Sequence, residues 1–304
     1  MVRLEREVET TDPPVGFTWG ESDGNRYLTS PDNGLRRISD DGWKLLTALA
    51  EGEVSKEELE GTPRKIVEDL EREGYLRPDE PVVKLRKPDG IRLWPRLVAF
   101  LCLVAVGAVV AWRETQTMPN VVELLTPARI VPFLGLVVVT LAIHEGGHYF
   151  TSKPYFDPSV RVGLVNGAIP AAITDTTEAW VLPRNHRLWI TLAGPFVQIV
   201  WTLLVAGVHL VFFPDSVVLS AFVIMTVAET VVVLNPLIHG DGYLLLIDAF
   251  DVVDLRTQGI EHLRNRNLTF AAVYVVVSYG FGAVMGLVIL GSVASFLGAD
   301  VPLV

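Results

Sequence analysis

Five apolar stretches in the last two thirds of the chain constrain its fold more than any other sequence feature. They span residues 97–112, 130–150, 188–213, 216–238 and 269–297. Each is long enough, or nearly long enough, to cross about 30 Å of hydrocarbon as a helix that rises about 1.5 Å per residue. The pattern predicts a mainly α, polytopic membrane protein with about five transmembrane helices.

Most charged residues lie before the first apolar stretch. The 304-residue chain has 35 acidic and 25 basic residues, and residues 1–93 contain 21 of the acidic and 15 of the basic ones. This distribution predicts a small acidic domain at residues 1–90, followed by a membrane domain at residues 91–304. Nucleic acid is not expected as a partner, because binding phosphates requires clustered positive charge.

The cysteine content and the kinds of charged residue narrow the possible class of protein further. The single cysteine, Cys102, lies inside an apolar stretch, which excludes a disulfide framework and a thiolate metal cluster. Residues 1–90 contain no apolar segment typical of a secretory signal, so none is expected. The basic residues are mostly arginine. An acid-rich, lysine-poor composition is typical of adaptation to high salt.

Basic residues flank the apolar stretches unequally. Five precede the first stretch: Lys84, Arg86, Lys87, Arg92 and Arg96. Seven lie in the loops after the second and fourth stretches, whereas the loop after the first carries two. Because Lys and Arg are retained on the cytoplasmic side, we expect a multi-pass protein of a prokaryotic cell membrane. Its N-terminal domain would be cytoplasmic and its C-terminus external.

The second apolar stretch ends in the sequence HEGGH. His144 and His148 are four residues apart, so on a helix both imidazoles share a face and can reach one metal ion. Glu145 would lie beside a metal-bound water, which in zinc hydrolases has a pKa of about 7. The alternative is a chance match, or histidines that make polar contacts between helices. Ionisable groups in membrane segments are costly and usually functional, which favours the metal site.

A catalytic zinc site needs a third protein ligand. The fourth apolar stretch runs into the sequence NPLIHGDGY, in which Pro236 is expected to end the helix and free backbone carbonyls. Gly240 and Gly242 permit a turn that would direct Asp241 toward the metal. His239 is the competing ligand, two residues away. The predicted topology places both motifs at the cytoplasmic side.

These residues resemble the motifs of the site-2 protease family of intramembrane zinc metallopeptidases. In that family an HExxH on one membrane helix is joined by the Asp of an NPxxxxDG-type segment on a later helix. The resemblance implies that His144, His148 and Asp241 are zinc ligands and that Glu145 is the catalytic base. Asn235 would belong to the motif that binds substrate or orients the site. The resemblance covers about residues 94–297.

One further segment supports the resemblance, and another departs from the family pattern. Ala193-Gly194-Pro195 resembles the AGP element of the family, where small residues let a helix approach the catalytic one. His239-Gly240 departs from the usual residues before the aspartate, and the segment is closer to the branch associated with peptide maturation. Between the second and third stretches, residues 160–165 and 167–173 are predicted to form a small sheet that could pair with an unwound substrate strand.

The N-terminal domain is predicted to be winged-helix-like. Residues 26–38 indicate a hairpin with its turn at residues 30–34. Ser39 caps a helix that stops at Gly52, and two short helices and an apolar strand start at Tyr75-Leu76 follow. This order resembles small leader-recognition domains related to the pyrroloquinoline-quinone chaperone. The alternative is a generic helical adaptor or regulatory domain.

Together these features predict a zinc metalloendopeptidase that hydrolyses a peptide bond in or near the membrane. Its partners would be the lipid bilayer and a precursor peptide recruited by the N-terminal domain. One alternative keeps the protease but gives it a membrane-tethered regulator as substrate. The other is a non-catalytic membrane protein for peptide export or immunity.

Overall fold

A computed structural model describes the chain except for residues 1–3, 5, 12, 23, 31–33, 79, 118–123, 166–168, 253–254 and 297–304. The chain divides into two compact units. The first unit comprises Met1–Leu103, Val137–Leu164 and Pro170–Gln198, and the second comprises Val104–Leu136, Val165–Ile169 and Ile199–Val304. The first unit therefore holds the predicted N-terminal domain together with the helix segment that carries HEGGH.

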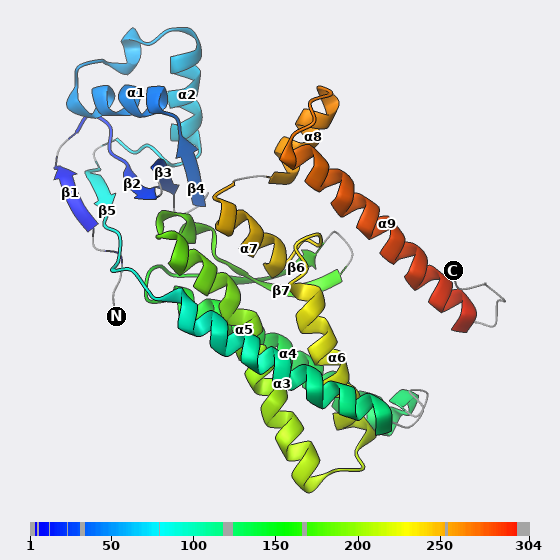
Figure 1. The fold of residues 1–304 in the computed structure, drawn as a ribbon. Helices are drawn as coiled ribbons and strands as arrows, with labels where there is room; N and C mark the ends of the chain where they lie inside the picture. Colours follow the sequence, from blue (N-terminus) through cyan, green and yellow to red (C-terminus); the bar gives the residue numbers. More distant parts are fainter. Residues whose placement is uncertain are drawn as a thin grey trace. The chain divides into compact units, whose positions relative to one another are not determined.

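The N-terminal part of the first unit is a five-stranded sheet (Figure 1). Its strands are β1 (Arg6–Thr10), β2 (Thr18–Ser22), β3 (Asn25–Ser30), β4 (Gly34–Ile38) and β5 (Val82–Leu85), in the order β1-β5-β2-β3-β4. Strands β2 and β5 are parallel, and the other neighbouring pairs are antiparallel. Strand β5 thus brings the chain back into the sheet just before the first long helix.

Three helical segments follow the hairpin: α1 (Asp40–Glu51), the 3-10 turn η1 (Lys56–Glu58) and α2 (Gly61–Arg72). As predicted, Ser39 caps α1, because its Oγ accepts a hydrogen bond from the Gly42 N–H at 3.2 Å. Gly52 ends α1 in the left-handed conformation, with φ of 72°. Strands β2–β5 and both α-helices share one core, which includes Phe17, Trp19, Leu28, Leu46, Leu49 and Leu70.

The sequence predicts part of this domain. The hairpin at residues 26–38 is confirmed by the β3–β4 pairing, although residues 31–33 of its turn lie outside the described residues. The predicted strand start at Tyr75-Leu76 is wrong: both residues are buried in the turn after α2, and the strand begins at Val82. Strands β1 and β2 were not expected.

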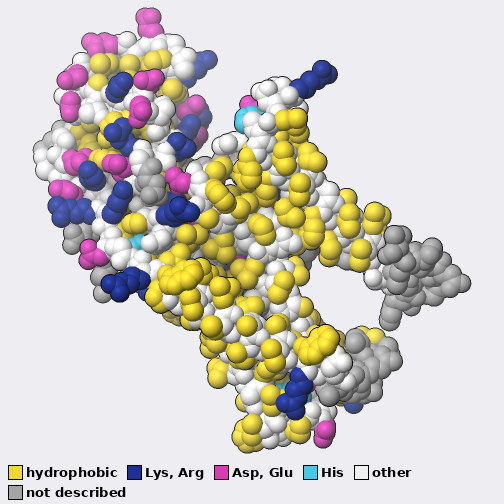
Figure 2. Space-filling model, viewed as in Figure 1, with side chains coloured by type: hydrophobic (Ala, Val, Ile, Leu, Met, Phe, Trp, Pro, Cys, Tyr) yellow, Lys and Arg dark blue, Asp and Glu magenta, His cyan; other side chains and the backbone are white. Residues whose placement is uncertain are grey.

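Four of the described helices are long and apolar enough to cross a membrane: α3 (Leu93–Thr117), α4 (Pro127–Ser152), α5 (Arg184–Phe212) and α9 (Phe270–Phe296). Helix α6 (Val217–Val233) is apolar but has only 17 residues. Each predicted apolar stretch thus overlaps one of these helices, while the count of five crossings stays a prediction. Figure 2 shows hydrophobic side chains over these helices and charged ones gathered on the N-terminal domain.

Between α4 and α5 the chain forms β6 (Ser159–Val165) and β7 (Ile169–Asp175), which pair as predicted, and then the 3-10 turn η3 (Thr177–Val181). The segment after η3 packs on the N-terminal sheet. The Ser22 hydroxyl donates to the Leu182 carbonyl at 2.9 Å, and the buried Arg187 donates to Ser22 Oγ at 3.2 Å. The Arg187 guanidinium also lies 4.7 Å from the Trp180 ring centroid.

A buried polar network joins α3, α5 and α6 in the second unit. His209 Nε2 lies 3.0 Å from Glu114 Oε2, and the Ser220 hydroxyl donates to the same oxygen at 2.7 Å. His209 Nδ1 lies 2.8 Å from the Phe213 carbonyl. All three side chains are at most 5% exposed. Buried groups of this kind must be hydrogen-bonded to be tolerated, so the network fixes the register of the three helices.

Candidate metal centre

The two histidines of HEGGH lie on successive turns of α4 and face the same point. Both side chains are buried. Their Nε2 atoms are 3.2 Å apart. This is the arrangement that the spacing of four residues predicts for a helix.

Each imidazole is held by its other ring nitrogen. His148 Nδ1 lies 2.9 Å from the Ile190 carbonyl oxygen, and His144 Nδ1 lies 2.5 Å from Gln198 Oε1, both groups of α5. A carbonyl oxygen can only accept, so both Nδ1 atoms carry the proton. The two Nε2 atoms then present lone pairs to each other. Facing lone pairs at 3.2 Å repel unless a cation lies against them, so the pair fits two ligands of one metal ion.

Helix α5 approaches α4 closely because of two glycines. A Cβ on Gly194 would lie 2.2 Å from His148 Nε2 and 2.8 Å from His144 Nε2. A Cβ on Gly147 would lie 2.5 Å from the Ala193 carbonyl oxygen. Only glycine leaves this space, so the predicted role of the Ala193-Gly194-Pro195 element in close helix approach is confirmed. Gly194 also keeps the Nε2 face of both histidines open.

Glu145, the predicted base, is held by a residue that the sequence did not single out. The Thr174 backbone N–H donates to Glu145 Oε2 at 2.8 Å, and the Thr174 hydroxyl donates to the same oxygen at 2.7 Å. Thr174 is the residue before the last of strand β7. The hydroxyl is also 3.3 Å from the Glu145 carbonyl oxygen. The small sheet therefore fixes the orientation of the Glu145 carboxylate.

Asp241 is the first residue of α7 (Asp241–Phe250) in the second unit, and it is 9% exposed. Helix α6 ends at Val233, and α7 returns directly past that end. A Cβ on Gly242 would lie 2.3 Å from the Leu234 carbonyl oxygen, so glycine is required for the close return. The prediction that the chain turns sharply before Asp241 is confirmed.

The turn between α6 and α7 is fixed by side chains of α8 (Leu255–Arg264) and α9. The Pro236 carbonyl accepts from the Tyr274 hydroxyl at 2.6 Å, and the Leu237 carbonyl accepts from Ser278 at 2.6 Å and Arg256 at 3.2 Å. Both carbonyls lie beyond the end of α6 at Val233, and these three hydrogen bonds hold the turn in place.

The turn also contains the other two candidate site residues, Asn235 and His239. Asn235 Oδ1 accepts from the Leu237 N–H at 2.9 Å and so shapes the turn; its proposed role in substrate binding stays a prediction. His239, the competing ligand, is exposed, and its ring centroid lies 5.2 Å from that of Tyr243. His144, Glu145 and His148 thus belong to the first unit, whereas Asn235 and Asp241 belong to the second. Their joining into one site stays a prediction.

Comparison with known proteins supports the same chemistry. Over 188 residues the chain is 29% identical to the "Putative zinc metalloprotease Rip2" of Mycobacterium tuberculosis, in strains H37Rv and Erdman. The match covers 52% of this chain and 71% of the relative. No family model and no solved structure matches the chain. The similarity supports a site-2 protease-like identity, a protease function and zinc as the metal.

Proposed function

We propose that this protein is an intramembrane zinc metalloendopeptidase. The observation that carries the proposal is the pair of buried histidines whose Nδ1 atoms are fixed and whose Nε2 atoms face each other at 3.2 Å. Two imidazole nitrogens and a carboxylate oxygen are a ligand set of catalytic zinc. His144, His148 and Asp241 would supply that set. The similarity to a zinc metalloprotease supports the choice of metal.

Glu145 is the base of the proposed reaction. When bound, zinc would polarise the scissile carbonyl and make the attacking water more acidic. The Glu145 carboxylate would accept the proton of that water and pass it to the leaving amine. Two hydrogen bonds from Thr174 hold Oε2, which leaves Oε1 to take the proton. The buried Nδ1 contacts keep both imidazoles in the tautomer that binds metal.

The long apolar helices support cleavage in or near the membrane. HEGGH lies near the end of α4, one of the four helices able to cross a membrane by length and composition. A helical substrate hides its amides, so a membrane segment must unwind before attack. The β6–β7 sheet is suited to pair with such an unwound strand. We propose that the N-terminal domain recruits a precursor peptide, with a membrane-tethered regulator as the alternative substrate.

Replacing Glu145 tests the proposal. Fluorescein-labelled casein in detergent micelles would serve as the probe, with zinc content measured on the same samples. The variant Glu145→Gln should keep its zinc and cleave about a hundredfold to ten-thousandfold more slowly, because it lacks the general base. Glu261→Gln, which changes an exposed carboxylate on α8, is the matched control. Casein cleavage by Glu145→Gln at the parent rate would contradict the assignment of Glu145 as the base. A parent protein that binds zinc but cleaves no casein would favour the non-catalytic alternative.

Neighbouring genes separate the two substrate classes. A short precursor peptide or a peptide-modifying enzyme encoded next to this chain would support peptide maturation. A single-span regulator encoded there would favour release of a membrane-tethered factor. Co-expression of the encoded neighbour with the parent and with Glu145→Gln then shows whether its size changes only with the active protein.

A further inference from the structure

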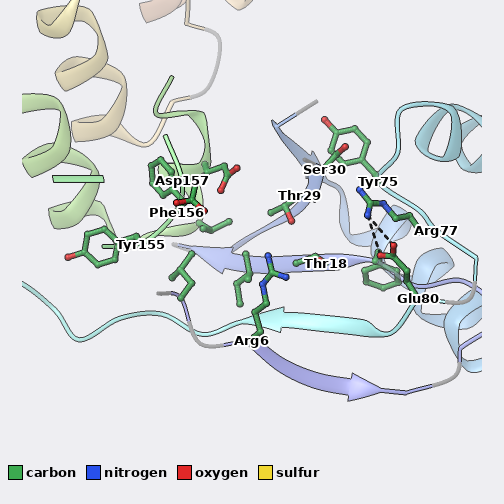
Figure 3. A pocket seen from close by; sticks show the side chains of 15 residues that line it. Arg6, Thr18, Thr29, Ser30, Tyr75, Arg77, Glu80, Tyr155, Phe156 and Asp157 are labelled. Atoms are coloured by element: carbon green, nitrogen blue, oxygen red, sulfur yellow. Dashed lines mark hydrogen bonds and ion pairs between the residues drawn. The ribbon is translucent and has the colours of Figure 1, made fainter. Parts of the chain in front are cut away.

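A cavity of about 470 Å³ lies within the first unit, between the N-terminal sheet and the segments that follow α4 and β7 (Figure 3). Strands β2 and β3 contribute Thr18 and Thr29, and the segment after α4 contributes Tyr155, Phe156 and Asp157. A cavity of this size can hold a ligand with the volume of a few amino-acid side chains. The catalytic account above uses none of these residues.

One part of the lining is apolar. Phe17, Phe156 and Val181 line the cavity, and each is at most 7% exposed over the whole residue. The Tyr155 ring also contributes, and it packs edge-on against His186 with centroids 5.2 Å apart. These residues offer contact to aliphatic or aromatic side chains rather than to a fully polar ligand.

The charged part of the lining contains more acidic than basic residues. Asp157 and Glu178 come from the segments beside the membrane helices. At the other end of the cavity Arg77 donates to both carboxylate oxygens of Glu80, at 3.1 and 3.4 Å, and so is neutralised. Arg6 is the remaining basic group of the lining. Burial, followed by the charges of Asp175 and Asp157, raises the pKa of Glu178, and the charge of Arg6 lowers it in part. Further positive charge beside Glu178 would favour its ionised form.

We propose that this cavity binds a basic and apolar peptide segment of the substrate, through contacts of its Lys or Arg side chains with Asp157 and Glu178. The inference rests on the proposed protease function and names the part of the substrate that is recognised. Lys and Arg are concentrated where membrane segments emerge on the cytoplasmic side. A substrate released from the membrane therefore carries such a segment next to its apolar span, and apolar neighbours would pack on Phe156 and Val181.

The chain links this cavity to the catalytic base. Glu178 follows Thr174 by four residues, and Thr174 holds the Glu145 carboxylate. Four residues span at most about 14 Å. An extended substrate covers that length in about four residues. The bound Lys or Arg should therefore lie within about five residues of the cleaved bond.

Peptide binding tests the inference without requiring cleavage. The full-length Glu145→Gln protein in detergent micelles would be titrated with a fluorescein-labelled ten-residue peptide in which two arginines are flanked by phenylalanine and leucine. We expect binding that weakens with salt. Removing both charges with Asp157→Asn and Glu178→Gln should raise the Kd at least fivefold. The matched control Glu51→Gln, an exposed carboxylate of α1, should leave the Kd unchanged.

A second peptide tests the inference without requiring the double variant to fold. The same peptide with glutamates in place of the arginines should bind the unaltered cavity at least tenfold more weakly. Equal binding of both peptides, or an unchanged Kd in the double variant, would overturn the inference. Zinc content and casein cleavage by the parent are measured separately. Their failure with peptide binding intact counts against the protease, whereas intact cleavage with no arginine preference counts against the cavity alone.

Discussion

Thr174 donates two hydrogen bonds to one carboxylate oxygen of Glu145, from its backbone N–H at 2.8 Å and from its hydroxyl at 2.7 Å. The residues are 29 positions apart, one on β7 and one on α4. The contact makes the small sheet a support for the proposed base. Through Thr174, the segment between the end of β7 and the start of α5 is also connected directly to the proposed catalytic base.

Removing the Thr174 hydroxyl should slow catalysis without removing metal. A hydrogen bond to a charged group contributes about 1.5 kcal/mol or more, and about 1.4 kcal/mol corresponds to a tenfold rate change. Thr174→Val should therefore lower kcat for casein about tenfold with little change in KM, and Thr174→Ser should restore it. Zinc content should stay at the parent value in both. Parent kcat in Thr174→Val would show that the hydroxyl does not position Glu145.

Adding one methyl group at Gly194 should damage the metal site. The new Cβ would lie 2.2 Å from His148 Nε2, so the imidazole must move. Zinc affinity of Gly194→Ala, measured by competition with a chelator, should fall about tenfold to a hundredfold. Gly207→Ala on the same helix is the control, because nothing lies within 4 Å of its Cβ. Equal zinc affinity in the two variants would mean that Gly194 is not needed at the site.

The buried network of the second unit should contribute to stability. Glu114→Ala leaves His209 buried without its carboxylate partner, which costs about 3 kcal/mol or more. Thermal unfolding in detergent should show a lower Tm for Glu114→Ala, while Asp215→Ala, an exposed carboxylate in the loop between α5 and α6, should change Tm little. In a double-mutant cycle with His209→Ala the two losses should not add. Additive losses would show that the pair does not interact.

The raised pKa of Glu178 predicts a pH-dependent cost of folding. The unfolded chain loses this proton near the ordinary value of 4.5, before the folded chain does. Stability therefore falls as pH rises from about 4.5 through the raised pKa, and it is restored below 4.5 where both states are protonated. Glu178→Gln should raise Tm at pH 7 and have no effect at pH 4. A Tm difference that is constant between these pH values would contradict this assignment.

Much of the helical framework follows from hydrophobic length. The stretch 130–150 lies inside α4 (Pro127–Ser152), because its apolar run continues to the end of HEGGH. The stretch 216–238 is longer than α6, because the helix ends at Val233, three residues before Pro236. Strand β1 could not be predicted: all five of its residues are exposed, and it is positioned by pairing with β5, which lies about 75 residues later in the chain.

Some residues of the candidate site could likewise be predicted from the sequence, and others could not. His144, Glu145 and His148 are recognisable because their spacing matches the turn of a helix. Thr174 carries no comparable signal, since a lone threonine in a strand is common and its partner is distant in sequence. Gln198 is a polar residue in an apolar helix, and only its 2.5 Å contact with His144 Nδ1 gives it a role.

Zinc content measured across single variants tests the central claim most directly. The parent should hold one zinc per chain by mass spectrometry of the purified protein. His144→Ala, His148→Ala and Asp241→Ala should each lose it, whereas His239→Ala, which alters the exposed histidine of the same turn, should keep it. One zinc retained at parent affinity in Asp241→Ala, or lost in His239→Ala alone, would contradict the proposed ligand set.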